Sequence, residues 1–138
     1  MGHINLLATV LGAVAFFAIG ALWYGPLFGR PWRQLNGITD EVMKAGPRRG
    51  QNPIWLIMVL AFAFELLIAV MLAHLIARTS PAPAVIMMMA VGFGATIMTP
   101  ALGINYLFQT RPGKLFAIDA GYFIVGMAAM GGVFAALA

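Results

Sequence analysis

The sequence predicts an all-helical membrane protein with four transmembrane helices in a single domain, and three observations lead to this fold class. Hydrophobic residues make up 62% of the 138 residues and charged residues only 9%, whereas a soluble domain has about 25% charged residues. Four apolar stretches each reach the roughly 20 residues that a spanning helix needs. The Lys and Arg residues are concentrated between these stretches. Such a composition excludes an ordinary soluble domain.

The four expected helices are separated by loops of very different length. They cover residues 4–24, 53–77, 84–108 and 115–138. The first is expected to be a retained helix and not a cleaved signal peptide, because the cations follow the apolar stretch instead of preceding it. In the long loop, about residues 25–52, Thr39 is expected to cap a short helix whose first turn holds Asp40 and Glu41. The second loop is short and proline-rich, which predicts that the second and third helices are antiparallel neighbours.

Positive charge predicts how the chain is threaded through the membrane. Loops one and three lie on the same side of a four-helix protein, and together they hold seven cations against one in loop two. The positive-inside rule makes that side cytoplasmic and places both termini outside. In loop order the cations are Arg30, Arg33, Lys44, Arg48 and Arg49, then Arg78, then Arg111 and Lys114.

Two pairs of similar segments point to an internal repeat of two hairpins. The segment from Tyr24 to Pro31 is similar to that from Tyr106 to Pro112, and Phe62 to Glu65 is similar to Phe116 to Asp119. Because the first and third helices run in the same direction, the repeat would be parallel, with its pseudo-twofold axis along the membrane normal. The spacing from the Arg-Pro pair to the acid differs between the halves, so chance similarity is the alternative.

Three segments together resemble a known family. They are Gly20 to Gly29, which contains Trp23-Tyr24 and Pro26, then Asn105 to Phe108, and Leu115 to Tyr122 with its Asp-Ala-Gly-Tyr motif. The set resembles a bacterial family of small four-helix membrane proteins catalogued only as a domain of unknown function, and the resemblance covers nearly the whole chain. It implies a bacterial inner-membrane protein, and it supplies no activity for any residue.

Glu65 is one of two acidic residues that fall inside predicted spanning helices. It lies roughly 18 Å past Pro53, at a rise of about 1.5 Å per residue, which places it near the membrane midplane. An ionised carboxyl is costly there and usually faces protein, water or a partner. We therefore expect Glu65 to carry a proton at neutral pH. It is the candidate proton-binding or ion-binding residue, with a protonated packing hydrogen bond as the structural alternative.

Asp119 lies closer to the cytoplasmic end of its helix than Glu65 does. It is only about 7 to 8 Å past Lys114, so Lys114, Arg111 and Arg30 are within reach as ion-pair partners. An amide at similar depth in the third helix can hydrogen-bond between helices and hold them together. The predicted polar network consists of Asn105, Asp119 and Tyr122.

The third predicted helix contains Thr96, Thr99 and Pro100. Pro100 has no N–H to donate to the carbonyl of Thr96, which predicts a kink that nearby hydroxyl groups or water can satisfy. A kink at Thr96 and Pro100 can gate a path through the protein, although such kinks are also ordinary in membrane helices.

Small residues in the fourth predicted helix predict a face for close helix packing. Ala128, Gly132 and Ala136 repeat at four-residue spacing. Small residues at this spacing let two helix backbones approach each other. The face serves packing either within the chain or between copies.

The sequence lacks the residues that metal, cofactor and enzyme sites need. It has no cysteine and only two histidines, so we expect no thiolate zinc site, no iron–sulfur cluster and no other metal site. No P-loop, dinucleotide fingerprint or HExxH motif occurs. We expect no cofactor, no catalytic residue and no enzyme activity. Action on a lipid through Asp119 and Tyr122 is the less favoured alternative.

Two functions remain open for a chain of this kind. The first is a proton-linked or cation-linked transport or permeation protein for small solutes, working as an oligomer, in which Glu65 binds the proton or cation. The second is a non-catalytic accessory or assembly subunit of a larger membrane complex. The expected partners are the lipid bilayer and either further copies or a larger complex. The net charge of +4 does not predict a nucleic-acid partner, because no soluble face presents it.

Overall fold

The computed structural model describes residues 2–46 and 50–138, and all regular secondary structure in these residues is helical. Four helices are long and apolar enough to cross a membrane: Leu6–Leu27, Ile54–Thr79, Pro83–Phe108 and Gly113–Ala136. The second is a single helix, α4 (Ile54–Thr79), and the fourth is α7 (Gly113–Ala136). The predicted all-helical, four-span fold class is confirmed, and each span ends within a few residues of the expected boundary.

The first span is longer at its C-terminal end than the sequence predicts. It begins as α1 (Leu6–Leu22), where the Asn5 side chain accepts a hydrogen bond from the Ala8 N–H, and continues as the π-helical turn η1 (Trp23–Leu27). Pro26 lies inside this turn and cannot donate a helical hydrogen bond. The wider turn continues past it because the Phe28 N–H donates to the Trp23 carbonyl, five residues back, at 2.7 Å.

The third span is interrupted at the place where a kink is predicted. It consists of α5 (Pro83–Phe93), the π-helical turn η2 (Gly94–Met98) and α6 (Thr99–Phe108), with Pro100 in the first turn of α6. The Thr96 hydroxyl donates to the Gly92 carbonyl at 2.5 Å, and the Thr99 hydroxyl donates to the Gly94 carbonyl at 2.7 Å. Hydroxyl groups therefore bond to backbone carbonyls here. A gating role of this turn stays a prediction.

The segment between the first two spans contains two short helices, α2 (Gly29–Leu35) and α3 (Asp40–Lys44). The Thr39 hydroxyl accepts from the Val42 N–H at 3.2 Å, which confirms the predicted cap. Arg48 and Arg49, two of the cations that predict the topology, lie outside the described residues.

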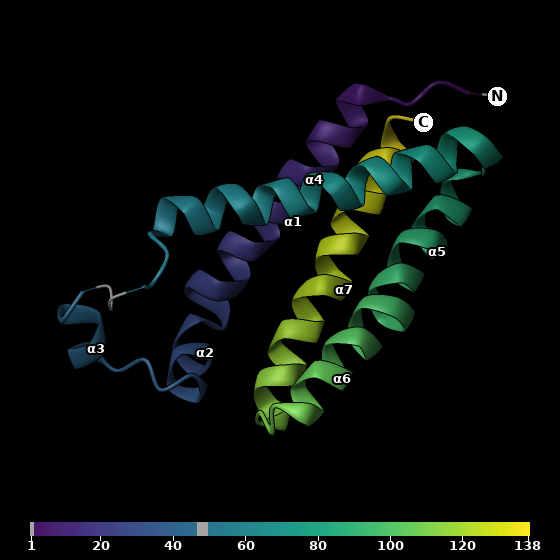
Figure 1. Cartoon of the computed structure of the whole chain (residues 1–138). Coiled ribbons are helices and arrows are strands. Elements are labelled where there is room, and N and C mark those ends of the chain that lie inside the picture. The colour runs from purple at the N-terminus through teal and green to yellow at the C-terminus, as the bar shows by residue number, and fades with distance from the viewer. Residues whose placement is uncertain (1, 47–49) are drawn as a thin grey trace.

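In Figure 1 the third and fourth spans run side by side, whereas α4 crosses obliquely over the others. At 26 residues α4 has the same length as the third span, so its oblique path does not follow from length alone. The two hairpins therefore differ in shape, and the internal repeat stays a prediction.

The two termini lie at one end of the bundle, and the turn between α6 and α7 lies at the other, together with α2 and α3 (Figure 1). At the first end the Asn5 side-chain amide donates to the Leu137 carbonyl at 3.3 Å, and the Gly2 N–H donates to the Ala77 carbonyl at 3.0 Å. These contacts join the N-terminal segment to α4 and to the end of α7.

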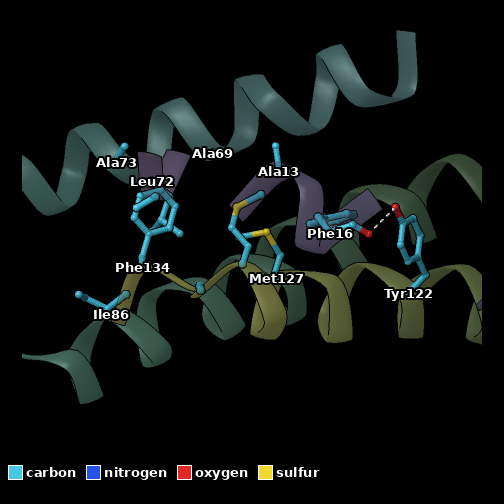
Figure 2. Close-up of a cluster of buried hydrophobic side chains, with 12 residues drawn as sticks. Ala13, Phe16, Ala69, Leu72, Ala73, Ile86, Tyr122, Met127 and Phe134 are labelled. Atoms are coloured by element: carbon cyan, nitrogen blue, oxygen red, sulfur yellow. Dashed lines mark hydrogen bonds between the residues drawn. The ribbon is translucent and has the colours of Figure 1, made fainter. Parts of the chain in front are cut away.

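The core forms around α7, which packs most extensively against α1 and α5. A Cβ atom added at Gly126 would lie 3.0 Å from the Phe16 ring, and one added at Gly131 would lie 2.6 Å from the Ala90 Cβ. Glycines thus set the distances from α7 to both neighbours. The buried cluster, to which α4 also contributes, is shown in Figure 2 and includes Ala13, Phe16, Leu72, Ile86, Met127 and Phe134.

The expected small-residue face of α7 is not where the helices meet. A Cβ atom added at Gly132 would meet nothing within 4 Å, and Ala136 is exposed. The close contacts use Gly126 and Gly131 instead, five residues apart, because one faces α1 and the other faces α5. A four-residue repeat describes packing against a single partner helix, and α7 packs between two.

Candidate functional site

Glu65 lies in the middle of α4 and is buried, with 7% of its surface exposed. Its Oε1 atom accepts a hydrogen bond from the Tyr122 hydroxyl of α7 at 2.6 Å. Its Oε2 atom is also buried, and it has no hydrogen-bond partner in the described part of the chain. A carboxyl with one satisfied and one unsatisfied oxygen is unusual, because buried polar atoms are normally paired.

Tyr122 is held in place by aromatic neighbours and by the absence of a side chain at Gly20. Its ring packs edge-on against Phe16 and Tyr24, with centroids 5.0 and 5.2 Å away. A Cβ atom at Gly20 would lie 2.8 Å from the Tyr122 hydroxyl oxygen. The hydroxyl also lies 3.4 Å from the Phe16 carbonyl, the contact drawn in Figure 2. Tyr122 therefore has two acceptors within reach, and Glu65 is the nearer one.

A cavity of about 470 Å³ lies beside Glu65, between α1, α4 and α7. Glu65, Tyr24 and Tyr122 are the residues with polar side-chain atoms among those that line it, and none of the lining residues that the structure describes is Lys, Arg or His. The remaining lining is apolar and largely aromatic. Its aromatic residues are Phe16, Phe17, Tyr24, Phe64, Tyr122 and Phe123.

Asp119 forms a second buried carboxyl site, and its hydrogen-bond partners are tyrosines. It is 9% exposed. Its Oδ1 atom accepts from the Tyr24 hydroxyl at 2.5 Å, and its Oδ2 atom accepts from the Tyr106 hydroxyl. Nearby, the Trp23 indole N–H donates to the Ile118 carbonyl at 2.8 Å. These bonds join the end of the first span, α6 and α7.

The structure corrects the predicted polar network. Asn105 is exposed, whereas its neighbour Tyr106 is buried and donates to Asp119. The predicted cationic partners are replaced by phenol groups, and the Arg111 guanidinium instead lies 5.2 Å from the centre of the Tyr106 ring. Tyr122 belongs to the Glu65 site and not to the Asp119 site. The network is therefore two separate carboxyl–tyrosine sites, whose rings meet where Tyr24 packs against Tyr122.

Sequence reasoning missed Tyr24 and Tyr106 as partners of Asp119, although one pattern pointed to them. The internal repeat pairs Tyr24 with Tyr106, and both hydroxyls donate to the same carboxyl. The role of Gly20 had no comparable pattern, because it depends on the position of a side chain from another helix.

The Glu65 carboxyl can keep a hydrogen bond to Tyr122 in either protonation state. A protonated carboxyl can donate to the Tyr122 oxygen while Tyr122 donates to the Phe16 carbonyl, and an ionised carboxyl can accept from Tyr122. Across residues 2–46 and 50–138, no group of three or more His, Cys, Asp or Glu residues could hold a metal ion.

Comparison with known proteins identifies the family of this chain. No curated protein and no solved structure matches the sequence. A family model described as a protein of unknown function, DUF1761, matches residues 7–135 and so covers nearly the whole chain, including both carboxyl–tyrosine sites. The chain, which has four helices long and apolar enough to cross a membrane, therefore belongs to the DUF1761 family.

Proposed function

We propose that this protein is a proton-linked transport or permeation protein for small solutes, and that Glu65 is its proton-binding residue. The observation that carries the proposal is the buried Oε2 atom of Glu65, which lacks a partner among the described residues beside a cavity. Polar groups at membrane depth that serve only to hold helices together are normally paired, as Asp119 is. A half-paired carboxyl on a residue that lines a cavity is suited to exchanging what it binds.

The Tyr122 hydroxyl supports a change of protonation at Glu65. Its acceptors on either side, Glu65 and the Phe16 carbonyl, give it a hydrogen bond in both charge states of the carboxyl. Neither state then leaves the hydroxyl unpaired, which would cost about 1–3 kcal/mol. Proton binding and release can therefore occur without rebuilding the core.

The lining of the cavity favours an apolar solute over a hydrated inorganic ion. Hydrated ions need polar groups to replace lost water, and the cavity wall is dominated by aromatic and aliphatic side chains. Met58 and Phe64 line the cavity and are exposed on α4, with 42% and 67% of their surfaces accessible. A solute can thus reach the cavity from the hydrocarbon region of the bilayer.

We place the protein in the bacterial inner membrane, with α2, α3 and the turn between α6 and α7 in the cytoplasm. The excess of Lys and Arg in loops one and three supports this orientation. We also propose that it works as an oligomer, because four helices rarely enclose a path alone. The oblique α4 leaves large apolar side chains exposed, including Trp55 and Val59, where a second copy can pack.

The Glu65→Gln variant tests the proposed function. Purified protein is placed in liposomes that contain a pH-sensitive dye, and a proton gradient is imposed while valinomycin and potassium compensate charge. We expect flux above that of empty liposomes for the wild type and flux at the empty-liposome level for Glu65→Gln. Glu41→Gln is the matched control, because Glu41 is exposed in α3, and it should keep the wild-type rate.

Assembly state is measured on the same samples by size-exclusion chromatography. Loss of flux with unchanged assembly supports transport. Wild-type flux no faster than that of empty liposomes, or undiminished flux in Glu65→Gln, would contradict it.

An accessory role in a larger complex is the second candidate, and the exposed first half of α4 favours it. Ile54, Trp55 and Val59 are 69%, 65% and 57% exposed, and a partner helix can cover them as well as lipid can. Purification from native membranes in a mild detergent distinguishes the two functions. A stoichiometric larger partner supports the accessory role, and a homo-oligomer alone excludes it.

A further inference from the structure

We infer that the cavity beside Glu65 binds a lipophilic organic monocation, which takes the place of the proton on the carboxyl. The inference rests on the proposed function and names its substrate class. One cation enters as one proton leaves Glu65 for water, so the charge of the site is the same in both states.

The charge balance of the site points to a monocation. A buried carboxylate needs a compensating charge, and the described residues that line the cavity include no Lys, Arg or His. The titratable groups that face Glu65 are the phenols of Tyr122 from α7 and Tyr24 from η1, which are neutral at physiological pH. A proton or an external cation must therefore balance Glu65, and a single carboxyl balances a single positive charge.

The aromatic wall determines what kind of cation fits. Six aromatic residues line the cavity, and aromatic faces attract organic cations, especially where water is excluded. The volume of about 470 Å³ lies within the range of roughly 300–1,000 Å³ typical of small-molecule sites. An inorganic ion would have to exchange its water shell for one carboxyl group, whereas a lipophilic cation has little hydration to lose.

The route to the cavity also selects for lipophilicity. Phe64 lines the cavity and is 67% exposed on α4. A ligand that dissolves in the hydrocarbon region meets this rim directly. A cation with apolar substituents satisfies both the apolar route and the acidic site.

Binding of tetraphenylphosphonium to the full-length protein in lipid nanodiscs tests the inference. Isothermal titration calorimetry in two buffers of different protonation enthalpy reports both affinity and proton release. We expect saturable binding with one proton released per cation. At pH values where Glu65 is protonated, the apparent affinity for tetraphenylphosphonium should fall about tenfold for each unit that the pH is lowered. The reason is that proton and cation compete for one carboxyl.

Four variants keep the test independent of folding. Glu65→Gln should abolish binding and proton release, while Glu41→Gln should bind as the wild type does. Phe64→Ala removes an exposed rim aromatic that lies outside the buried core cluster, and it should weaken binding about two- to fivefold. Glu65→Asp keeps the charge and should retain weakened, pH-dependent binding.

Several outcomes would overturn the inference. They are no saturable binding to the wild type, equal binding to wild type and Glu65→Gln, and equal binding of the neutral analogue triphenylphosphine oxide. The last two would identify an apolar site for lipid chains only. Proton flux through Glu65 without cation binding would refute the inference and leave the proposed function intact. Cation binding without proton flux would refute the proposed function and leave the binding site intact.

Discussion

Replacing Gly131 with alanine is expected to lower the free energy of unfolding by about 1–3 kcal/mol. The added Cβ atom would lie 2.6 Å from the Cβ of Ala90 on α5, whereas carbon atoms in contact prefer about 3.5–4.0 Å. Both atoms are fixed directly to a helix backbone, so no side-chain rotation relieves the clash. The helices α5 and α7 must move apart, and the packing around Met127 and Ile86 loosens with them.

The neighbouring glycine is a matched control for this prediction. A Cβ atom at Gly132 would meet nothing within 4 Å, so Gly132→Ala should cause no loss of stability. Adding Ala90→Gly to Gly131→Ala removes the clashing atom and should restore most of the loss. Equilibrium unfolding in detergent micelles measures all of these variants. Equal stability of Gly131→Ala and Gly132→Ala would refute the observed contact between α5 and α7.

Replacing Gly20 with alanine is expected to weaken tetraphenylphosphonium binding about tenfold or more. The added Cβ atom would lie 2.8 Å from the Tyr122 hydroxyl oxygen and would push the hydroxyl away from Glu65. A hydrogen bond to a charged group contributes about 1.5–3 kcal/mol, and each 1.4 kcal/mol corresponds to about tenfold in affinity. Without this donor the ionised carboxyl is less stable, so the proton competes better against the cation.

A double-mutant comparison shows whether Gly20 acts through Tyr122. Tyr122→Phe removes the same hydrogen bond and should weaken binding by a similar factor, and Gly20→Ala should add little to it. Gly92→Ala, on α5 with nothing within 4 Å of the added Cβ, should bind normally. If the double variant lost affinity by the product of the two single factors, Gly20 would act through a contact other than that with Tyr122.

The sequence predicts the spans well because hydropathy is a local property. A stretch of apolar residues of sufficient length must cross the membrane wherever its neighbours lie, and the Thr39 cap depends only on the next few residues. The extension of the first span past residue 24 was missed because Pro26 normally ends a helix, and a π-helical turn accommodates it here.

The side-chain partners could not be predicted because they depend on how the helices rotate and cross. Asn105 and Tyr106 are adjacent on one helix, about 100° apart, and both are polar enough to face the bundle. The structure turns Tyr106 inward and Asn105 outward. Similarly, the bond between Glu65 and Tyr122 joins α7 to α4, which crosses the bundle obliquely (Figure 1), and no residue near Glu65 in the sequence specifies that crossing.

Infrared difference spectroscopy of the protein in lipid nanodiscs tests most directly whether Glu65 holds an exchangeable proton. We predict a carbonyl band of a protonated carboxylic acid that disappears at alkaline pH and on addition of tetraphenylphosphonium. This band should be absent from Glu65→Gln and present in Asp119→Asn. A band that survives in Glu65→Gln, or a wild-type spectrum with ionised carboxylates alone at every pH, would contradict the account.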